Sequence, residues 1–463
     1  MMDTSRVSLR EKVGYGFGDA ASSMFWKIFS FYLAIFYTDV FGISAVAAGT
    51  MLLVTRIWDT AIDPIMGVVG DRTNTRWGKF RPYLLWVAVP FGIMGVLLFT
   101  TPDFGTTGKL VYAYITYTLM MMAYTAINVP YASLLGVMTS NTNDRTTLAS
   151  YRMIFAFGGS LLVVAIYQPL VDLFKKGVEV TTAYQLTMVV VGIVAVLFFF
   201  LTFSWTKERI KPPKSQQNSL KDDFNNLLKN VPWFILLGAG VMTLIFNSVR
   251  DGVAIYYFKY YIVDDTAVSL SKMTFTFSTL YFLLGQAFNM VGVAMAKPIS
   301  AKLGKRRTFM FAMVAAAVLS TMFYFCTRNN VVFLYILQAF TSFCAGMIFP
   351  LLWSMYADTA DYSEWKTGRR ATGLVFSASS MSQKLGWTLG GSLTLWLLGF
   401  FGFQANVDQT PETIEGIKYM LSFIPAIGAL VSGIFMYFYK LDEKTLKTIE
   451  SDLDMRRKAE MAS

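Results

Sequence analysis

Long apolar stretches alternate with short polar segments along the whole chain. A helix needs roughly 20 apolar residues to cross a bilayer, and twelve stretches reach about that length. The pattern therefore predicts an all-α integral membrane protein with twelve transmembrane helices. The expected ranges are 14–38, 44–70, 82–101, 109–137, 146–171, 182–205, 232–261, 270–296, 307–327, 330–357, 371–402 and 415–439.

One long polar connection divides this series into two sets of six. It contains the sequence KERIKPPKSQQNSLKDDF, which is charged and carries two adjacent prolines. We predict a six-helix bundle over 1–205, a cytoplasmic central loop over 206–231, a second six-helix bundle over 232–440 and a polar, helical cytoplasmic tail over 441–463.

Two short segments recur at equivalent places in the two sets. RMIFAFGGS begins at Arg152 and KLGWTLGGS begins at Lys384, with the same spacing from the basic residue to Gly-Gly-Ser. The basic loop 70–81 is echoed by AKLGKRR at 301–307. Parallel repeats of six helices, with a substrate site between them, are the internal symmetry of major facilitator transporters. We therefore expect the major facilitator fold with two six-helix pseudo-repeats.

Composition narrows the function further. Only 15% of the residues are charged, whereas soluble proteins carry about 25%. The chain has no histidine, which excludes a Ser-His-Asp triad, a histidine-ligated zinc ion and a histidine-ligated heme. Cys326 and Cys344 are interpreted as buried apolar residues. We expect no enzymatic activity, no catalytic residues and no cofactor.

Basic residues are distributed unequally between the polar segments. The segments on the side of the two termini hold most of the 40 Lys and Arg residues. The opposite side holds only Lys109, Lys175, Lys176, Lys272, Arg328 and Lys418. By the positive-inside rule, both termini should face the cytoplasm from a multi-pass protein of the cell inner membrane. The net charge of +11 then reflects topology, and no nucleic-acid partner is expected.

Six basic residues fall inside the predicted spans, where each costs about 2.5–3.5 kcal/mol unless it has a partner or an aqueous cavity. They are Lys27, Arg56, Arg152, Arg250, Lys259 and Lys384. Arg56, Asp59 and Asp63 follow at i, i+3 and i+7 and share one helical face. Two carboxylates one turn apart form a sensible site for Na⁺ or H⁺. The alternative is a structural cluster neutralised by Arg56, Lys384 or Arg152.

A polar and aromatic stripe follows the predicted helix 109–137. Such side chains can stack on a sugar ring and hydrogen-bond it, whereas the alternative for any single tyrosine is interhelical packing. The stripe consists of Tyr117, Tyr124, Asn128 and Tyr131. On the first helix, three polar residues at a spacing of four share a face: Asp19, Ser23 and Lys27.

Charged residues also gather in two loops on the predicted cytoplasmic side. We predict that they pair across the two halves as a gate that closes this side, the alternative being solvated loop charge. The predicted network comprises Asp71, Arg72, Arg76, Lys79, Asp358, Asp361 and Arg370.

Six segments spread over the chain carry a specific resemblance. They are GYGFGDAAS at 14–22, FYTDVFG at 36–42, RIWDTAIDPIMG at 56–67, DRTNTRWGKFRP at 71–82, ITYTLMMMAYTAINVPYASL at 115–134 and ADTADYSEWKTGRRATG at 357–373. In these segments the chain resembles the glycoside-pentoside-hexuronide:cation symporters, the melibiose-permease-like branch of the major facilitator superfamily. The sequences of 71–82 and of NVPY are most similar to those of the glucuronide and xyloside carriers of that family.

The resemblance implies a cation site at Asp59, Asp63 and Thr125. Thr125 would add a hydroxyl from a neighbouring helix. Ile62 stands where the melibiose permease has an asparagine, and this departure leaves both Na⁺ and H⁺ open as the coupling ion.

A sugar site is implied as well. Its basic and aromatic positions match Arg152, Lys384 and Tyr124, whereas Ser23 and Asn128 replace two acidic residues of the family. Losing two carboxylates while keeping two basic groups suits an acidic sugar or a differently held glycoside. The expected substrate-binding residues are Asp19, Ser23, Tyr124, Asn128, Arg152 and Lys384.

We therefore expect a secondary active transporter that imports a small-molecule glycoside, pentoside or hexuronide by symport with Na⁺ or H⁺. Membrane lipid is the other expected partner, and no obligate protein partner is inferred. Three alternatives are a major facilitator transporter of a non-sugar solute, a membrane enzyme that uses the paired carboxylates, and a sugar sensor that does not transport. The depth of the carboxylates disfavours the enzyme, and the short cytoplasmic extensions disfavour the sensor.

Overall fold

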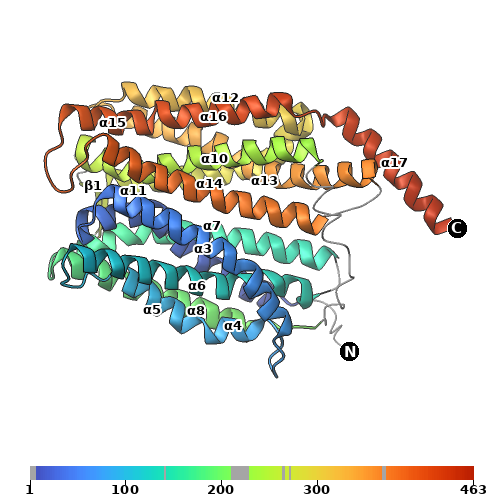
Figure 1. Ribbon diagram of the computed structural model, residues 1–463, viewed down its shortest axis with the longest axis horizontal. Coiled ribbons are helices and arrows are strands. Elements are labelled where there is room, and N and C mark those ends of the chain that lie inside the picture. Colours follow the sequence, from blue (N-terminus) through green and yellow to red (C-terminus); the bar gives the residue numbers. More distant parts are fainter. Residues whose placement is uncertain are drawn as a thin grey trace. The chain divides into compact units, whose positions relative to one another are not determined.

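The computed structural model describes residues 7–139, 142–209, 229–262, 266–270, 273–367 and 372–462 (Figure 1). The first predicted set of six corresponds to α1 (Leu9–Phe31), α2 (Leu33–Ile35), η1 (Phe36–Phe41), α3 (Ala45–Arg72), α4 (Arg81–Trp86), α5 (Ala88–Leu98), α6 (Thr106–Met138), α7 (Thr142–Phe174) and α8 (Val180–Trp205). The second set corresponds to α10 (Val231–Tyr256), η2 (Tyr257–Ile262), α11 (Phe277–Leu303), α12 (Lys305–Met322), η3 (Phe323–Phe325), α13 (Val331–Thr367), α14 (Thr372–Phe400), α15 (Pro411–Leu421) and α16 (Phe423–Phe438). The tail forms α17 (Glu443–Ala462).

The predicted range 270–296 is wrong at its start. A short antiparallel hairpin of β1 (Thr266–Leu270) and β2 (Met273–Thr276) comes before α11. Threonine, valine and phenylalanine in these strands favour extended backbone. The helix therefore begins only at Phe277.

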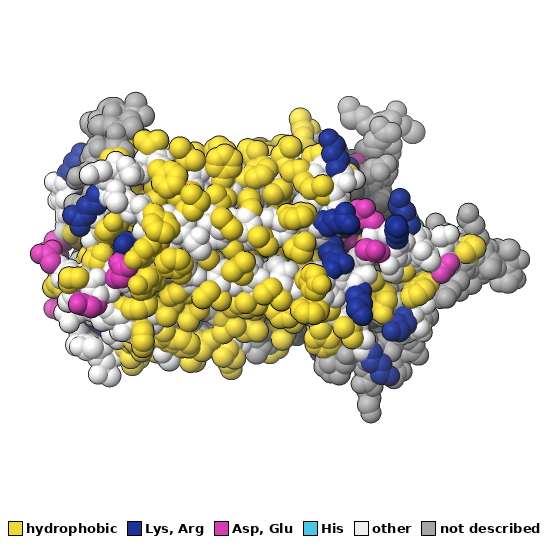
Figure 2. Space-filling view, turned by 90° about the horizontal axis from the view of Figure 1, so that it is seen from above, with side chains coloured by type: hydrophobic (Ala, Val, Ile, Leu, Met, Phe, Trp, Pro, Cys, Tyr) yellow, Lys and Arg dark blue, Asp and Glu magenta, His cyan; other side chains and the backbone are white. Residues whose placement is uncertain are grey.

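Eight of the described helices are long and apolar enough to cross a membrane. A ninth is added if α1 and the helical segment Leu33–Phe41, which are bent by 53° at their junction, form one span. The predicted ranges 44–70, 82–101 and 371–402 are helical but do not meet this test among the described residues. The multi-pass helical fold is thus confirmed, and the number of twelve stays a prediction. Apolar side chains cover the middle of the visible face, and Lys and Arg side chains lie on either side of it, most of them on the right (Figure 2).

Contacts divide the chain into two units that differ from the predicted halves. The first unit contains Met1–Lys214, Ala254–Leu283 and Leu395–Thr413. The remaining three segments, Ser215–Val253, Leu284–Thr394 and Ile414–Ser463, form the second unit. Ends of α10, α11 and α14 therefore belong with the helices of the first half.

Glycines allow close helix packing in each unit, as is usual between membrane helices. In the first unit, a Cβ on Gly159 of α7 would lie 2.5 Å from the Ala20 carbonyl oxygen of α1. In the second unit, a Cβ on Gly346 of α13 would lie 2.2 Å from the Asn289 carbonyl oxygen of α11.

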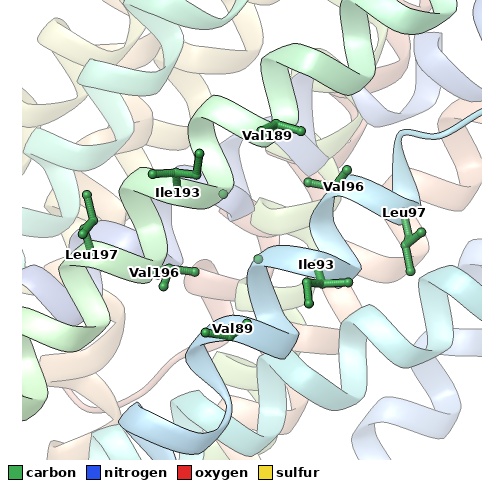
Figure 3. Close-up of a pocket in the computed structure, with 10 residues that line it drawn as sticks. Val89, Ile93, Val96, Leu97, Val189, Ile193, Val196 and Leu197 are labelled. Carbon is green, nitrogen blue, oxygen red and sulfur yellow. The ribbon is translucent and has the colours of Figure 1, made fainter.

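Where α5 and α8 meet, only aliphatic residues and glycine line a surface groove (Figure 3). This lining suits lipid hydrocarbon.

Candidate cation and substrate site

The two carboxylates of α3 meet a hydroxyl of α6 inside the first unit. Thr125 Oγ1 lies 2.8 Å from Asp59 Oδ1 and 3.0 Å from Asp63 Oδ1. The three residues meet because α3 packs along α6 and because a spacing of four places both aspartates on one face. Asp59 is 3% exposed and Thr125 is 2% exposed. The structure therefore brings together the three residues expected to bind a cation.

This arrangement offers oxygen ligands only. The Thr125 hydroxyl has one proton and can donate it to one carboxylate at a time. Two carboxylates and a hydroxyl could hold a hard monovalent cation such as Na⁺, which oxygen ligands suit. They could equally hold a proton as the coupling ion, because carboxylate oxygens accept protons.

Arg56 lies one turn before this cluster on α3. Its Nε donates to Tyr117 Oη at 2.8 Å, and its guanidinium carbon lies 4.7 Å from the centroid of the Trp26 ring. Aromatic faces and a phenol oxygen stabilise a partly buried guanidinium. The Tyr117 hydroxyl thus serves a structural contact, which favours the packing interpretation for this tyrosine.

Asp19 and Arg152 form an ion pair between α1 and α7. Arg152 Nε donates to Asp19 Oδ2 at 2.9 Å, and the two side chains are 33% and 14% exposed. The guanidinium carbon lies 5.3 Å from the Tyr131 ring centroid, while Tyr131 Oη donates to the Tyr15 carbonyl oxygen at 2.6 Å. A Cβ on Gly18 would lie 2.5 Å from Tyr131, so only glycine leaves room for this ring.

Asn128 is held by Ser22, the neighbour of Ser23 in the sequence. Its Oδ1 accepts from Ser22 Oγ at 2.8 Å, and its Nδ2 donates to the Tyr124 carbonyl oxygen at 3.0 Å. Ser22 is buried whereas Ser23 is partly exposed. Ser22 is the last residue of the motif GYGFGDAAS, and this position could have indicated its role in the site. The Tyr124 ring packs against Trp26, with centroids 6.0 Å apart.

Two intramembrane basic residues belong to the second unit. Lys384 lies partly buried on α14. Arg250 of α10 is 5% exposed and donates from Nη2 to Gln338 Oε1 at 2.6 Å. Its guanidinium also faces the rings of Phe246 and Phe323.

The predicted cytoplasmic gate residues make local contacts. Asp358 accepts from Lys305 Nζ at 2.7 Å. The Lys79 backbone N–H donates to Glu208 at 2.8 Å, whereas Arg72 and Arg76 are exposed. Asp361 is partly buried on α13, while Arg370 and the side chain of Asp71 lie outside the described residues. Pairing across the halves stays a prediction.

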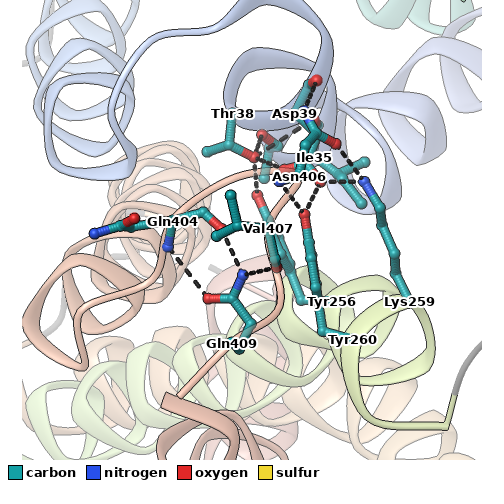
Figure 4. A network of polar contacts seen from close by, with 11 residues as sticks. Ile35, Thr38, Asp39, Tyr256, Lys259, Tyr260, Gln404, Asn406, Val407 and Gln409 are labelled. Carbon is teal, nitrogen blue, oxygen red and sulfur yellow. Dashed lines mark hydrogen bonds and ion pairs between the residues drawn. The ribbon is translucent and has the colours of Figure 1, made fainter.

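The sequence analysis did not identify a polar network around the buried Asp39 carboxylate, in the first unit. The Asp39 carboxylate, 2% exposed, contacts Lys259 Nζ and Tyr260 Oη and accepts from Thr38 Oγ1 at 2.6 Å. Asn406 Nδ2 donates to the Asp39 carbonyl oxygen at 2.6 Å. These five residues, the Asp39 network, join η1 and η2 to the loop after α14 (Figure 4). The motif FYTDVFG contains Asp39, but the motif alone does not show which distant residues contact this carboxylate.

Comparisons with known proteins agree along nearly the whole chain. Residues 14–443 match the family described as MFS/sugar transport protein. The putative glycoside/cation symporter YagG of Escherichia coli is 35% identical over 459 residues, covering 98% of this chain and 97% of the relative. The isoprimeverose transporter of Lactiplantibacillus pentosus is 34% identical over 461 residues, covering 98% and 93%. The glucuronide carrier protein homolog of Escherichia coli is 32% identical over 460 residues, covering 98% and 97%.

Solved structures agree on the fold. The inward open xylose transporter XylE of E. coli aligns with a TM-score of 0.61 and 14% identity, covering 96% of this chain and 98% of that one. A bacterial homolog of the human lysosomal transporter Spinster aligns with a TM-score of 0.69 and 11% identity, covering 95% and 97%. At such low identity these two neighbours support the fold alone. Family match, relatives and helical architecture together establish that the chain belongs to the glycoside-pentoside-hexuronide:cation symporter family of the major facilitator superfamily.

Proposed function

We propose that this protein imports a glycoside, pentoside or hexuronide into the cytoplasm by symport with Na⁺ or H⁺. Sugar symport across the inner membrane is the general activity that the family and the names of its members support. The observation that carries the proposal is the buried contact of Thr125 with both Asp59 and Asp63. An ion bound there would neutralise charge inside an apolar bundle, where an uncompensated carboxylate is costly.

The coupling would follow from differential stability of the loaded states. A ligand shifts a conformational equilibrium only by its differential affinity for the two states. With the ion bound and the sugar in place at Asp19 and Arg152, the carrier would change its side of access, whereas the form loaded with one ligand alone would not. The Asp39 network would hold closed the side opposite the termini, and the loop charges around Asp358 would serve the cytoplasmic side.

The ion pair between Asp19 and Arg152 bears on the substrate. Because the Arg152 charge is already matched by a carboxylate at 2.9 Å, the pair as a whole is close to neutral. It can donate to and accept from sugar hydroxyls, while an acidic sugar would compete with Asp19 for the guanidinium. We therefore favour a neutral glycoside over a hexuronide. Competition of a uronide and its neutral analogue for uptake tests this, and stronger inhibition by the uronide would contradict it.

Uptake into vesicles containing the purified protein tests the whole proposal. Labelled glycosides, pentosides and uronides are supplied with a Na⁺ gradient or a pH gradient imposed separately. We expect one gradient to drive accumulation of one class of sugar, and Asp59→Asn to abolish accumulation while leaving some downhill exchange. A non-sugar solute remains the alternative, and it gains if no sugar accumulates under either gradient.

A further inference from the structure

A pocket lies at the border of three apolar helices in the second unit, far along the chain from the candidate site. It has a volume of about 560 Å³. Its walls come from the last residue of α11, the first turns of α12, the end of α16 and the start of α17. Because α11, α12 and α16 belong to membrane-crossing segments and α17 is a polar helix, the pocket lies where apolar surface gives way to water.

The lining combines two chemistries. Leu303, Met310 and Tyr437 supply an apolar wall, and Leu303 and Tyr437 are 48% and 66% exposed. Arg306, Arg307 and Lys444 supply basic groups. An amphiphile with an anionic head matches both parts, whereas a soluble anion would need no apolar wall.

Arg307 and Lys444 are the exposed basic groups of the pocket, whereas Arg306 forms part of its wall. Arg306 Nε donates to the Met436 carbonyl oxygen at 3.0 Å, and another of its nitrogens bonds the Tyr437 carbonyl oxygen, which fixes the guanidinium at the wall. Arg307 and Lys444 are exposed. Lys305 also lines the pocket, but its charge is matched by Asp358 at 2.7 Å.

Two carboxylates in the lining have local roles. Asp442 Oδ1 accepts from the Thr445 N–H at 2.9 Å and from its hydroxyl at 2.7 Å. Glu443 lies beside Gly304, where a Cβ would be 3.2 Å from its Oε1. Three further exposed lysines flank the lining without belonging to it, namely Lys302, Lys440 and Lys447.

We propose that this pocket binds the headgroup of an anionic phospholipid, with the phosphate against Arg306, Arg307 and Lys444 and the upper acyl chain against Met310 and Tyr437. Basic pockets at the ends of membrane helices recognise such headgroups, and each basic side chain near the surface contributes substantially. The site is independent of the sugar and the coupling ion. Orientation by the positive-inside rule assigns it to the cytoplasmic leaflet.

Lipid retention by the full-length protein tests the proposal. Protein in nanodiscs that contain phosphatidylglycerol and phosphatidylcholine is released and examined by native mass spectrometry. We expect the wild type to retain phosphatidylglycerol preferentially. Arg307→Gln with Lys444→Gln should weaken that retention roughly tenfold or more. Both residues are exposed, so the fold should survive, and an unchanged thermal unfolding temperature checks this.

Matched variants separate the explanations. Lys302→Gln with Lys447→Gln removes the same charge beside the pocket and should leave retention close to wild type, and Arg307→Lys should preserve most of it. Equal retention by the wild type and the pocket variant would overturn the proposal. An equal loss of lipid retention in the flanking variant would contradict the proposal, because it would show that general surface charge, and not the pocket, retains the lipid. Displacement of the lipid by millimolar inorganic phosphate would contradict the proposal in favour of a soluble anion as the ligand. Occupation of the pocket by a co-purified protein in place of the lipid would contradict it in favour of a protein partner.

Discussion

At the scale of single residues, the candidate cation site depends on one hydroxyl. The Thr125 hydroxyl of α6 lies within hydrogen-bond distance of both Asp59 and Asp63. It is the oxygen that α6 adds to the two carboxylates of α3, which repel each other at short range. We therefore expect the hydroxyl to control the affinity of the site for an ion.

Thr125→Val keeps the shape of the side chain and removes its oxygen. We expect the concentration of coupling ion needed for half-maximal uptake to rise roughly tenfold, because a hydrogen bond to a charged group contributes about 1.5–3 kcal/mol. Uptake measured against Na⁺ concentration and against pH checks this.

Thr116→Val is the matched control for Thr125→Val. Thr116 is a buried threonine of the same helix whose hydroxyl bonds the Tyr112 carbonyl oxygen at 2.8 Å. Its removal should leave the ion dependence unchanged. An equal effect of the two substitutions would assign Thr125 to packing.

At the scale of elements, the loop between α3 and α4 is fixed by a carboxylate. The backbone N–H groups of Lys79, Phe80 and Arg81 each donate to Glu208 at 2.8 Å. Gly78 precedes them at a φ of +110°, and a Cβ there would lie 2.4 Å from Glu208 Cδ. The motif DRTNTRWGKFRP thus encodes an anion-binding turn whose anion comes from the end of the first half.

Gly78→Ala should destabilise the protein by roughly 1–3 kcal/mol, because it combines a strained φ with a steric clash. Gly136→Ala is the control, since nothing lies within 4 Å of the position of its Cβ and alanine suits a helix interior better than glycine. Thermal unfolding in detergent compares the two variants. The same unfolding temperature for both would refute this account of the turn.

The helix α17 has a pH-sensitive start. Hydrogen bonds from Thr445 hold the pKa of Asp442 below its ordinary value of 3.8. Because the pKa is lower in the folded protein, the stabilisation is present above the unfolded value and is lost as the pH falls through the folded one. The protection of the amides in the first turn of α17, corrected for the intrinsic exchange rate at each pH, should therefore fall below about pH 4.

Asp442→Ala should produce a similar loosening at neutral pH. We expect roughly fivefold faster amide exchange in the first turn, which corresponds to the loss of a helix cap. Lys447→Ala, on the exposed face of α17, is the control and should leave exchange unchanged. Identical amide exchange in Asp442→Ala and the wild type would show that Asp442 does not stabilise the start of α17.

At the scale of the whole molecule, the Asp39 network joins segments that are distant in sequence. Asp39 follows the first helix, Lys259 ends the seventh predicted span and Asn406 follows the eleventh. Alternating access requires such contacts to form in one state and break in another. A buried carboxylate with one lysine partner is suited to this, because losing the partner is costly.

Lys259→Met should leave the Asp39 carboxylate without its described cation. We expect a loss of about 1–2 kcal/mol in stability, since Lys259 is 39% exposed and solvent screens part of its charge. Adding Asp39→Asn should recover some of this loss and also open the network, which slows net uptake. A double-mutant cycle on unfolding temperature and uptake measures both effects, and strictly additive values would show that the two residues do not interact.

Much of the fold follows from the sequence alone. Apolar length fixes which stretches become membrane helices, because an unpaired backbone group in lipid is too costly for any other local structure. Helical spacing places Asp59 and Asp63 on one face of their helix. The sequence motifs are sufficient to identify the family. The hairpin before Phe277 was missed because β-branched residues in a short apolar run are ambiguous between helix and strand.

Tertiary structure decided which side chains meet. The sequence could place Thr125 near the carboxylates only through resemblance, whereas the packing of α3 on α6 brings the oxygens within hydrogen-bond distance. It could not pair Arg152 with Asp19 or Asp39 with Lys259, which are 133 and 220 positions apart. Periodicity acts within one helix, whereas a buried charge is matched by whichever helix packs beside it, so the partners became known only once the helices were placed.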